Sequence, residues 1–179
     1  MKKNIIGLVI VLGLFMGGCT KKVEKPIIFD QYHIILTTEY IYQEIAANTM
    51  AGAPAIKQYI QENETGFAGS IIIAKIQLET GMDISTFATY NSKSITRKIM
   101  GSNKPSTDKF SFECGSGSID GILQKISIEE GDQEQYLNQM FFTDKNYLYG
   151  ISTMTTNKSE SKNLAKSLKN ISCATTAKE

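Results

Sequence analysis

The sequence has little of the residue types that commonly carry catalytic chemistry. Its 179 residues include one histidine, His33, and three cysteines, with no C-x-x-C pair. A soft-metal site or a dithiol redox site needs more ligands or another spacing. A proton-shuttle histidine needs a nucleophile or carboxylate beside it, and no motif designates one, so we interpret His33 as a strand-face residue. We therefore predict a protein that is not an enzyme, with no catalytic residue, no metal site and no cofactor.

An excess of charge of either sign is also absent. The chain carries 19 Lys+Arg and 18 Asp+Glu. Without Lys2 and Lys3, which lie in the segment described next, the balance is 17 against 18, a net charge of −1. A nucleic-acid interface needs basic residues clustered on one face, whereas the lysines here are scattered among acids along the chain. The composition predicts no nucleic-acid partner and no strongly electrostatic partner.

Long hydrophobic runs are missing as well. The longest apolar run covers residues 5–16, which is shorter than the about 20 helical residues that a bilayer core requires. Lys2 and Lys3 precede it, and two glycines and Cys19 follow it, in the order typical of a cleavable export signal. We predict a signal peptide over residues 1–18 rather than a transmembrane anchor; a secreted protein cut at another site is the alternative.

Residues 15–19, FMGGC, resemble the lipobox of bacterial lipoproteins, in which the thiol is diacylated and becomes the mature N-terminus. The resemblance implies lipidation of Cys19, and two acyl chains hold a protein stably on a membrane surface. It further implies a place in the bacterial cell envelope. This is the periplasmic face of the outer membrane in a Gram-negative host, since Thr20 is not aspartate, or the outer face of the cell membrane in a Gram-positive host. Residues 19–26 would form a lipidated tether.

The two remaining cysteines, Cys114 and Cys173, are an even pair in an exported chain, which predicts a disulfide. On the chain-entropy model, such a bridge would contribute about 4 kcal/mol to stability. Two free thiols, or a metal or redox site, are the alternatives. Alternation of apolar residues places Phe110, Phe112 and Cys114 on one face of a strand, so the thiol of Cys114 is expected to point inward.

Residues 27–179 are predicted to form one domain of strands and helices. Asp83 is expected to cap one helix, which ends at Gly101. Asn157 and Glu160 lie near the start of the last helix. The side chains of Lys162, Lys166 and Lys169 on that helix should point outward. We interpret residues 115–118 as a hairpin connection rather than a phosphate-binding loop. The expected strands are 29–38, 69–78, 110–114, 119–128, 135–143 and 146–155; the expected helices are 54–63, 83–100 and 159–171, with 39–50 ambiguous.

This order of elements predicts an α+β fold, an antiparallel β-sheet with helices packed on its faces. It resembles the PsbP-like fold, which includes an extrinsic photosystem II protein, a nuclear import factor that binds the GTPase Ran, and bacterial DcrB-type envelope lipoproteins. Residues 29–38, 70–95 and 134–172 carry the resemblance. The chain departs from the family in a longer insertion at residues 39–65 and in its cysteine pair.

The resemblance implies a non-catalytic accessory role. Our leading hypothesis is a lipid-anchored envelope protein that acts as an adaptor for a protein partner and contacts the membrane through Cys19. The alternative is an envelope lipoprotein that binds a small ligand or a lipid in a pocket between sheet and helix, lined by tyrosines and phenylalanines. The aromatic residues of the last three strands are more simply explained by cross-strand packing than by ligand stacking; they are Tyr136, Phe141, Phe142, Tyr147 and Tyr149.

Overall fold

The structure is a computed structural model, and it describes most of the chain that follows the predicted signal. Cys19, residues 1–18 and Gly101 lie outside the described residues. No helix within the described ranges is long and apolar enough to cross a membrane. These ranges are 22–47, 55–63, 66–78, 82–98, 103–130 and 132–173.

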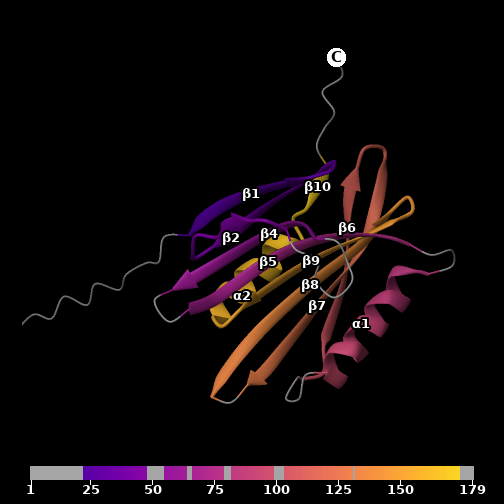
Figure 1. The fold of residues 1–179 in the computed structure, drawn as a ribbon. Helices are drawn as coiled ribbons and strands as arrows, with labels where there is room; N and C mark the ends of the chain where they lie inside the picture. The colour runs from indigo at the N-terminus through magenta and orange to yellow at the C-terminus, as the bar shows by residue number, and fades with distance from the viewer. Residues whose placement is uncertain are drawn as a thin grey trace, which may run out of the picture.

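Two antiparallel sheets and two helices make up the fold, which confirms the predicted α+β class (Figure 1). The small sheet has the order β1 (Val23–Phe29), β2 (Tyr32–Thr38) and β10 (Ser172–Cys173). The large sheet has the order β3 (Gln43–Ile45), β4 (Ala55–Asn63), β5 (Gly66–Gln77), β9 (Tyr147–Thr155), β8 (Gln133–Asp144), β7 (Gly117–Glu130) and β6 (Ser106–Cys114). The helices are α1 (Ile84–Lys98) and α2 (Lys158–Leu168).

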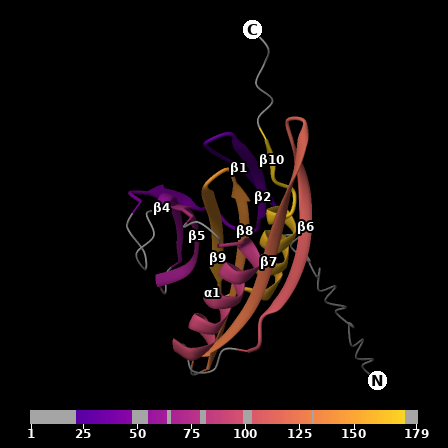
Figure 2. The same cartoon turned by 90° about the vertical axis from the view of Figure 1, so that its right-hand side faces the viewer.

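The path of the chain places the helices on opposite faces of the large sheet. From β5 the chain runs through α1 to β6 at the far edge, and the predicted meander β7, β8 and β9 then leads back to β5. From β9 it continues into α2 and ends in β10 of the small sheet. Figure 2 shows the strands of the large sheet between α1 and α2. The face that carries α2 is also covered by the small sheet.

The main core lies between the two sheets and α2, and it is rich in aromatic rings. Tyr32 of the small sheet is fully buried, with ring centroids 4.8 Å from Phe142 and 5.0 Å from Tyr149. Phe142 and Tyr149 stack at 5.0 Å, and Phe112 meets Phe142 edge-on at 5.3 Å. Such pairs add about 0.5–1.5 kcal/mol each beyond the area that they bury. Cross-strand packing therefore accounts for Phe142 and Tyr149, as predicted.

The start of α2 is fixed by capping and by a buried carboxylate. The Asn157 side chain accepts hydrogen bonds from the backbone N–H groups of Ser159 (2.8 Å) and Glu160 (3.1 Å), so it is the N-cap. Glu160 is fully buried, and its Oε2 accepts a hydrogen bond from the backbone N–H of Glu39 at 2.7 Å. Burial raises the pKa of the Glu160 carboxyl. These contacts join the helix to the loop after β2.

The N-terminal elements differ from the sequence prediction. The expected first strand 29–38 is two strands joined by a turn at Asp30 and Gln31, and β1 takes in residues 23–26 of the expected tether. Pro26 is compatible with a strand because β1 is an edge strand. Asp30 adopts a positive φ of 47°, and its Oδ2 accepts hydrogen bonds from Lys75 Nζ (2.6 Å) and the Tyr149 hydroxyl (2.7 Å). The turn is thereby held on the large sheet.

The expected helix at residues 54–63 is wrong, since residues 55–63 form strand β4. Ile56, Tyr59 and Ile60 fit helical spacing, but β-branched and aromatic residues also suit a strand, and pairing with β5 decides the outcome. Residues 43–45 of the ambiguous segment are strand β3. On β5, Ile71 and Ile73 are fully buried on one face, whereas Ile72, Ala74 and Ile76 on the other face are partly exposed.

Cys114 and Cys173 form a disulfide, with Cα atoms 5.0 Å apart. Cys114 ends β6 at the edge of the large sheet, and Cys173 lies in β10, so the bridge connects the two sheets. The turn that follows Cys114 has Gly115 at φ +65°, a conformation that favours glycine, and leads directly into β7. Residues 115 and 116 therefore form a hairpin turn, and residues 117 and 118 begin β7, which confirms the predicted hairpin connection.

Candidate functional site

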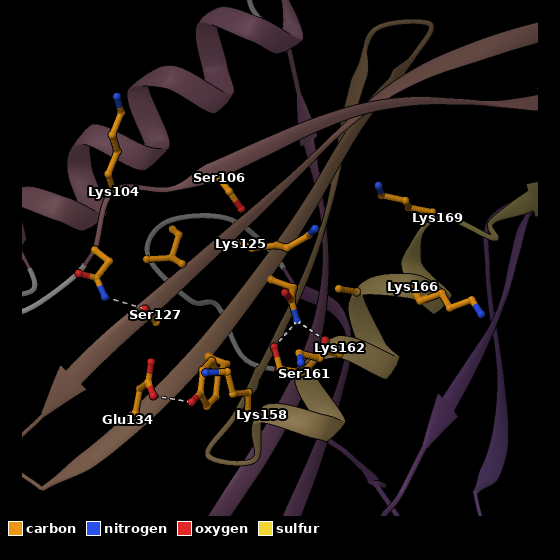
Figure 3. A pocket seen from close by; sticks show the side chains of 15 residues that line it. Lys104, Ser106, Lys125, Ser127, Glu134, Lys158, Ser161, Lys162, Lys166 and Lys169 are labelled. Carbon is orange, nitrogen blue, oxygen red and sulfur yellow. Dashed lines mark hydrogen bonds between the residues drawn. The ribbon is translucent and has the colours of Figure 1, made fainter.

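Lysine side chains gather in a groove between α2 and strands β6 to β8. The groove has a volume of about 560 Å³, and six lysines line it: Lys104, Lys125, Lys158, Lys162, Lys166 and Lys169. We call it the lysine groove. Figure 3 shows Lys158 and Lys162 close to Ser161 on α2, with Lys125 on the neighbouring strand and Lys104 at the far rim.

The spacing of residues along α2 explains how one helix supplies four of these lysines. Residues three or four apart lie on the same side of a helix, and Lys158, Lys162, Lys166 and Lys169 follow that spacing. The sequence prediction placed the last three outward, but it treated the lysines as scattered. That interpretation is wrong for this face, because the antiparallel register of β6 and β7 brings residues distant in sequence to the same helix.

Internal acids neutralise only part of this charge. Asp108 Oδ2 accepts hydrogen bonds from Lys125 Nζ and Lys169 Nζ, each at 2.8 Å, and these two ammonium groups lower the pKa of the Asp108 carboxyl to about 2. Lys162 and Lys166 have no acidic partner among the described residues. Glu134 is the acidic residue in the lining, and its Oε2 accepts a hydrogen bond from the Tyr136 hydroxyl.

The floor of the lysine groove is polar and hydrogen-bonded. Asn138 is buried, and its Nδ2 donates to Thr153 Oγ1 (3.2 Å) and to the backbone oxygen (3.0 Å) and Oγ (3.1 Å) of Ser161. These bonds attach α2 to strands β8 and β9. At the rim, Asn103 Nδ2 donates to Ser127 Oγ at 2.8 Å. The side chains of the helix are therefore held at a defined distance from the sheet.

A second groove lies on the opposite face of the large sheet, under α1, and it is apolar. Its volume is about 300 Å³. A further hollow of about 300 Å³ continues along α1 and shares Ile76 and Phe87 with it. We call the two together the sheet–helix groove. The first hollow is lined mainly by Ile72, Ala74, Ile76, Phe87, Leu137, Phe141, Leu148, Gly150 and Met154.

The sheet–helix groove stays open because α1 covers only one side of this face. Asp83 Oδ1 caps the helix by accepting from the backbone N–H of Thr86 at 2.7 Å, as predicted. Ala88 is buried against the sheet, and the Phe87 ring meets Phe141 edge-on at 5.3 Å. Tyr90, by contrast, is 75% exposed at the outer rim. Gly150 contributes no side chain to fill the space above Phe141.

Polar groups in the sheet–helix groove are satisfied by one another. Asn91 Nδ2 on α1 donates to Gln139 Oε1 at 2.8 Å, and Gln139 Nε2 donates to Ser152 Oγ at 3.2 Å. The chain of bonds ties the helix to the sheet across the hollow. Apart from Ser70, Gln77 and Thr86, the remaining lining is hydrocarbon, so the groove suits an apolar occupant.

The outer face of the small sheet carries exposed apolar side chains. Ile28 is 59% exposed and Ile35 is 43% exposed, on neighbouring strands that pair antiparallel. Pro26, directly opposite Ile35 in the register, is also exposed. His33, the residue weighed as a proton shuttle, lies on this face opposite Ile28, and its backbone oxygen accepts the Ser172 hydroxyl at 3.3 Å.

The five aromatic residues that the sequence places on the last three predicted strands lie in different parts of the fold. Phe142 and Tyr149 pack in the main core, Phe141 lines the sheet–helix groove, and Tyr136 lines the lysine groove. Tyr147 is exposed, with Lys75 Nζ 4.3 Å from its ring centroid. Within the part of the chain that the structure describes, no group of three His, Cys, Asp or Glu side chains is placed to hold a metal ion.

No protein-family model and no curated protein matches the chain. Among solved structures, LpqN of Mycobacterium tuberculosis, described as involved in cell envelope biogenesis, aligns over 86% of this chain and 91% of its own, with a TM-score of 0.53 and 12% identity. The two proteins share a fold. A Pseudomonas aeruginosa protein of unknown function, described as a putative regulator, aligns over 82% of this chain and 92% of its own, with a TM-score of 0.44 and 10% identity.

Proposed function

We propose that this chain is a non-catalytic binding protein of the bacterial cell envelope, anchored by lipid on Cys19, that holds the hydrocarbon chain of a lipid in the sheet–helix groove. The observation that carries the proposal is the unfilled apolar space between α1 and the large sheet. It favours the second of the two hypotheses drawn from the sequence, the ligand-binding lipoprotein. The likeness of fold to LpqN, described as involved in cell envelope biogenesis, supports the envelope setting as a proposal.

The dimensions and lining of the groove suit one hydrocarbon chain. Ligand sites usually enclose about 300–1,000 Å³ and are lined mostly by apolar side chains with a few polar groups. Each buried methylene contributes about 0.8 kcal/mol, so even a partly buried chain would be retained. Exposed Tyr90 at the rim offers an amphipathic ring where the polar end of a lipid would emerge.

The test measures binding of 11-(dansylamino)undecanoic acid to the mature chain, residues 19–179, carrying Cys19→Ser so that no attached lipid competes. The dye brightens when it enters an apolar site. Gly150→Leu should abolish the response, because a Cβ at Gly150 meets Phe141 at an ordinary 3.5 Å and the longer side chain would extend into the hollow. Thermal unfolding should show that the variant remains folded.

Ser118→Leu is the matched control, since it adds the same side chain at an exposed strand position outside the groove. It should bind the dye like the parent. Equal dye binding by the parent and the Gly150→Leu variant would exclude the sheet–helix groove as the site. Lipid extracted from the parent and identified by mass spectrometry would then name the natural ligand class.

The adaptor function remains a second candidate, because exposed Ile28 and Ile35 form an apolar surface on the small sheet. Changing both residues to Thr keeps β-branched side chains in the strands and removes hydrocarbon from the surface. Loss of a specific crosslinked protein partner from cells with this double variant, with dye binding unchanged, would favour the adaptor. Retention of every crosslink would count against it.

Lipidation of Cys19 is tested directly on the native protein. Mass spectrometry of the N-terminal peptide should find a diacylglyceryl-modified Cys19 and no residues 1–18. Cys19→Ser should release the chain from membranes. An intact, unmodified Met1 terminus would contradict both the anchor and the envelope setting.

A further inference from the structure

We propose that the lysine groove is a binding site for phosphate groups, a second site on the face of the large sheet opposite the sheet–helix groove. The inference goes beyond the proposed function, and it rests on the gathering of six lysines in one hollow of about 560 Å³ in a chain with almost no net charge. Among the described residues, Asp108 and Glu134 are the acids that contact or line this groove.

The cations of the groove lack enough internal partners. Lys125 and Lys169 share one carboxylate, that of Asp108. Lys158 Nζ lies 5.9 Å from the centroid of the Tyr136 ring. Lys162 and Lys166 have no acidic partner among the described residues. Ammonium groups held at neighbouring positions of one helix repel each other. An anion bound in the groove would offset this repulsion and would be attracted by several ammonium groups at once.

The chemistry of the lining favours phosphate over other anions. A lysine ammonium is a compact point charge with three donors that suits phosphate oxygens. Ser106 on β6 and Ser161 on α2 add hydroxyl groups to the lining. Single-stranded nucleic acid requires aromatic rings on which bases stack, and the aromatic ring in the described lining, that of Tyr136, lies beneath Lys158.

The position of the groove relative to the tether points to a source of phosphate. Lys22, the first described residue, donates through Nζ to Asn163 Oδ1 at 3.2 Å, and Asn163 adjoins Lys162 on α2. The chain from Lys22 back to Cys19 spans at most about 11 Å. If Cys19 is lipidated as proposed, α2 lies near the phosphate headgroups of the membrane, where each lysine contributes about fivefold to binding.

The first experiment titrates tripolyphosphate into the Cys19→Ser mature chain by calorimetry at low salt. The double variant Lys162→Gln/Lys166→Gln should bind about 30-fold more weakly, because two unpaired cations are lost. The matched control is Lys109→Gln/Lys145→Gln, the same change of charge at exposed positions outside the groove, which should bind like the parent. Equal affinities for both double variants would overturn the proposal.

A gain of affinity provides an independent check that does not depend on removing lysines. Asp108→Asn frees Lys125 and Lys169 from their shared carboxylate and should tighten binding of tripolyphosphate. Weaker or unchanged binding by this variant, with normal thermal unfolding, would mean that these two lysines serve structure rather than a ligand.

The second experiment separates a lipid headgroup from a free phosphate compound. Flotation with vesicles of phosphatidylcholine alone is compared with vesicles containing 30% phosphatidylglycerol. Binding to the anionic vesicles that Lys162→Gln/Lys166→Gln loses would support a headgroup as the source. Tripolyphosphate binding without vesicle binding would support the phosphate site and exclude the headgroup. Failure of both probes to bind would overturn the proposal, while leaving dye binding in the sheet–helix groove untouched.

Discussion

Removal of the disulfide should cost more stability than any single contact in the fold. The bridge joins Cys114 at the end of β6 to Cys173 in β10, and these elements belong to different sheets. β10 has two residues and pairs only through Ser172 and Cys173 with β2. Without the bridge, the C-terminal strand loses its direct crosslink to β6 and is joined to the large sheet only by the backbone through α2. Cys114→Ala/Cys173→Ala is the perturbation, since alanine introduces no polar group.

The magnitude follows from the length of chain that the bridge closes. With a sequence separation of 59, the chain-entropy model gives about 4 kcal/mol of stabilisation, acting mainly on the unfolded state. For a domain of this size the urea dependence of the unfolding free energy is about 2 kcal/mol per molar. The midpoint of urea unfolding should therefore fall by about 2 M in the double variant.

The assay is equilibrium unfolding in urea followed by far-ultraviolet circular dichroism. Reduction of the parent with phosphine should shift its midpoint towards that of the double variant, whereas the variant should not respond to reductant. This comparison separates the lost crosslink from any effect of the alanine side chains. An unchanged midpoint in both the reduced parent and the double variant would refute the entropic argument.

Three further predictions concern buried or paired polar groups, each measured by urea unfolding. Burial raises the pKa of the Glu160 carboxyl above its ordinary 4.5, so the folded chain binds the carboxyl proton more tightly than the unfolded chain does. The free energy of unfolding of the parent should therefore decline as pH rises through the raised pKa. The Glu160→Gln variant should not show this decline. Hydrogen bonds from Lys75 and Tyr149 lower the pKa of Asp30, so its contribution is present above the ordinary 3.8 and lost as pH falls through the lowered value. Asp30→Asn, which tolerates the positive φ, should cost about 1 kcal/mol at pH 7 and nothing in strong acid. Asn138→Ala leaves Thr153 and Ser161 without their buried donor and should cost about 1–3 kcal/mol at any pH; a loss below about 0.5 kcal/mol would contradict the role given to this floor.

Local patterns were enough to predict the meander and both helices. Alternating apolar residues define β7, β8 and β9, and Asp83 and Asn157 cap the two helices as their side chains suggest. These signals act over a few residues, so a sequence displays them directly. The disulfide was predictable for a related reason, since two cysteines allow a single intramolecular pairing.

The errors occur where non-local pairing decides the structure. The stretch of β4 fits helical spacing as well as strand composition, and only pairing with its neighbours β3 and β5 selects the strand. In β1, Pro26 and flanking charges resemble a linker, and the edge position that makes them acceptable is a property of the assembled sheet. Neither partner strand can be read from the segment itself.

The two grooves were harder to predict because each combines residues from several elements. The spacing of the lysines on α2 was visible in the sequence, but their meeting with Lys125 depends on the register of β7 and on the face chosen by the helix. The sheet–helix groove arises because small residues such as Gly150 and Ala74 stand where α1 does not reach. The order of apolar residues along a strand does not show which part of the strand a helix leaves uncovered, so this groove could not be predicted from the sequence.

The alternation of side chains along a strand explains how one sheet supports two unlike grooves. On β8, Asn138 forms the floor of the lysine groove, and the next residue, Gln139, bonds to Asn91 in the sheet–helix groove. The two sites are therefore separated by the thickness of the sheet and have no lining residue in common. Substitutions at distant positions without shared partners have additive effects. Phosphate binding and dye binding can thus be abolished separately, which makes each proposal refutable without the other.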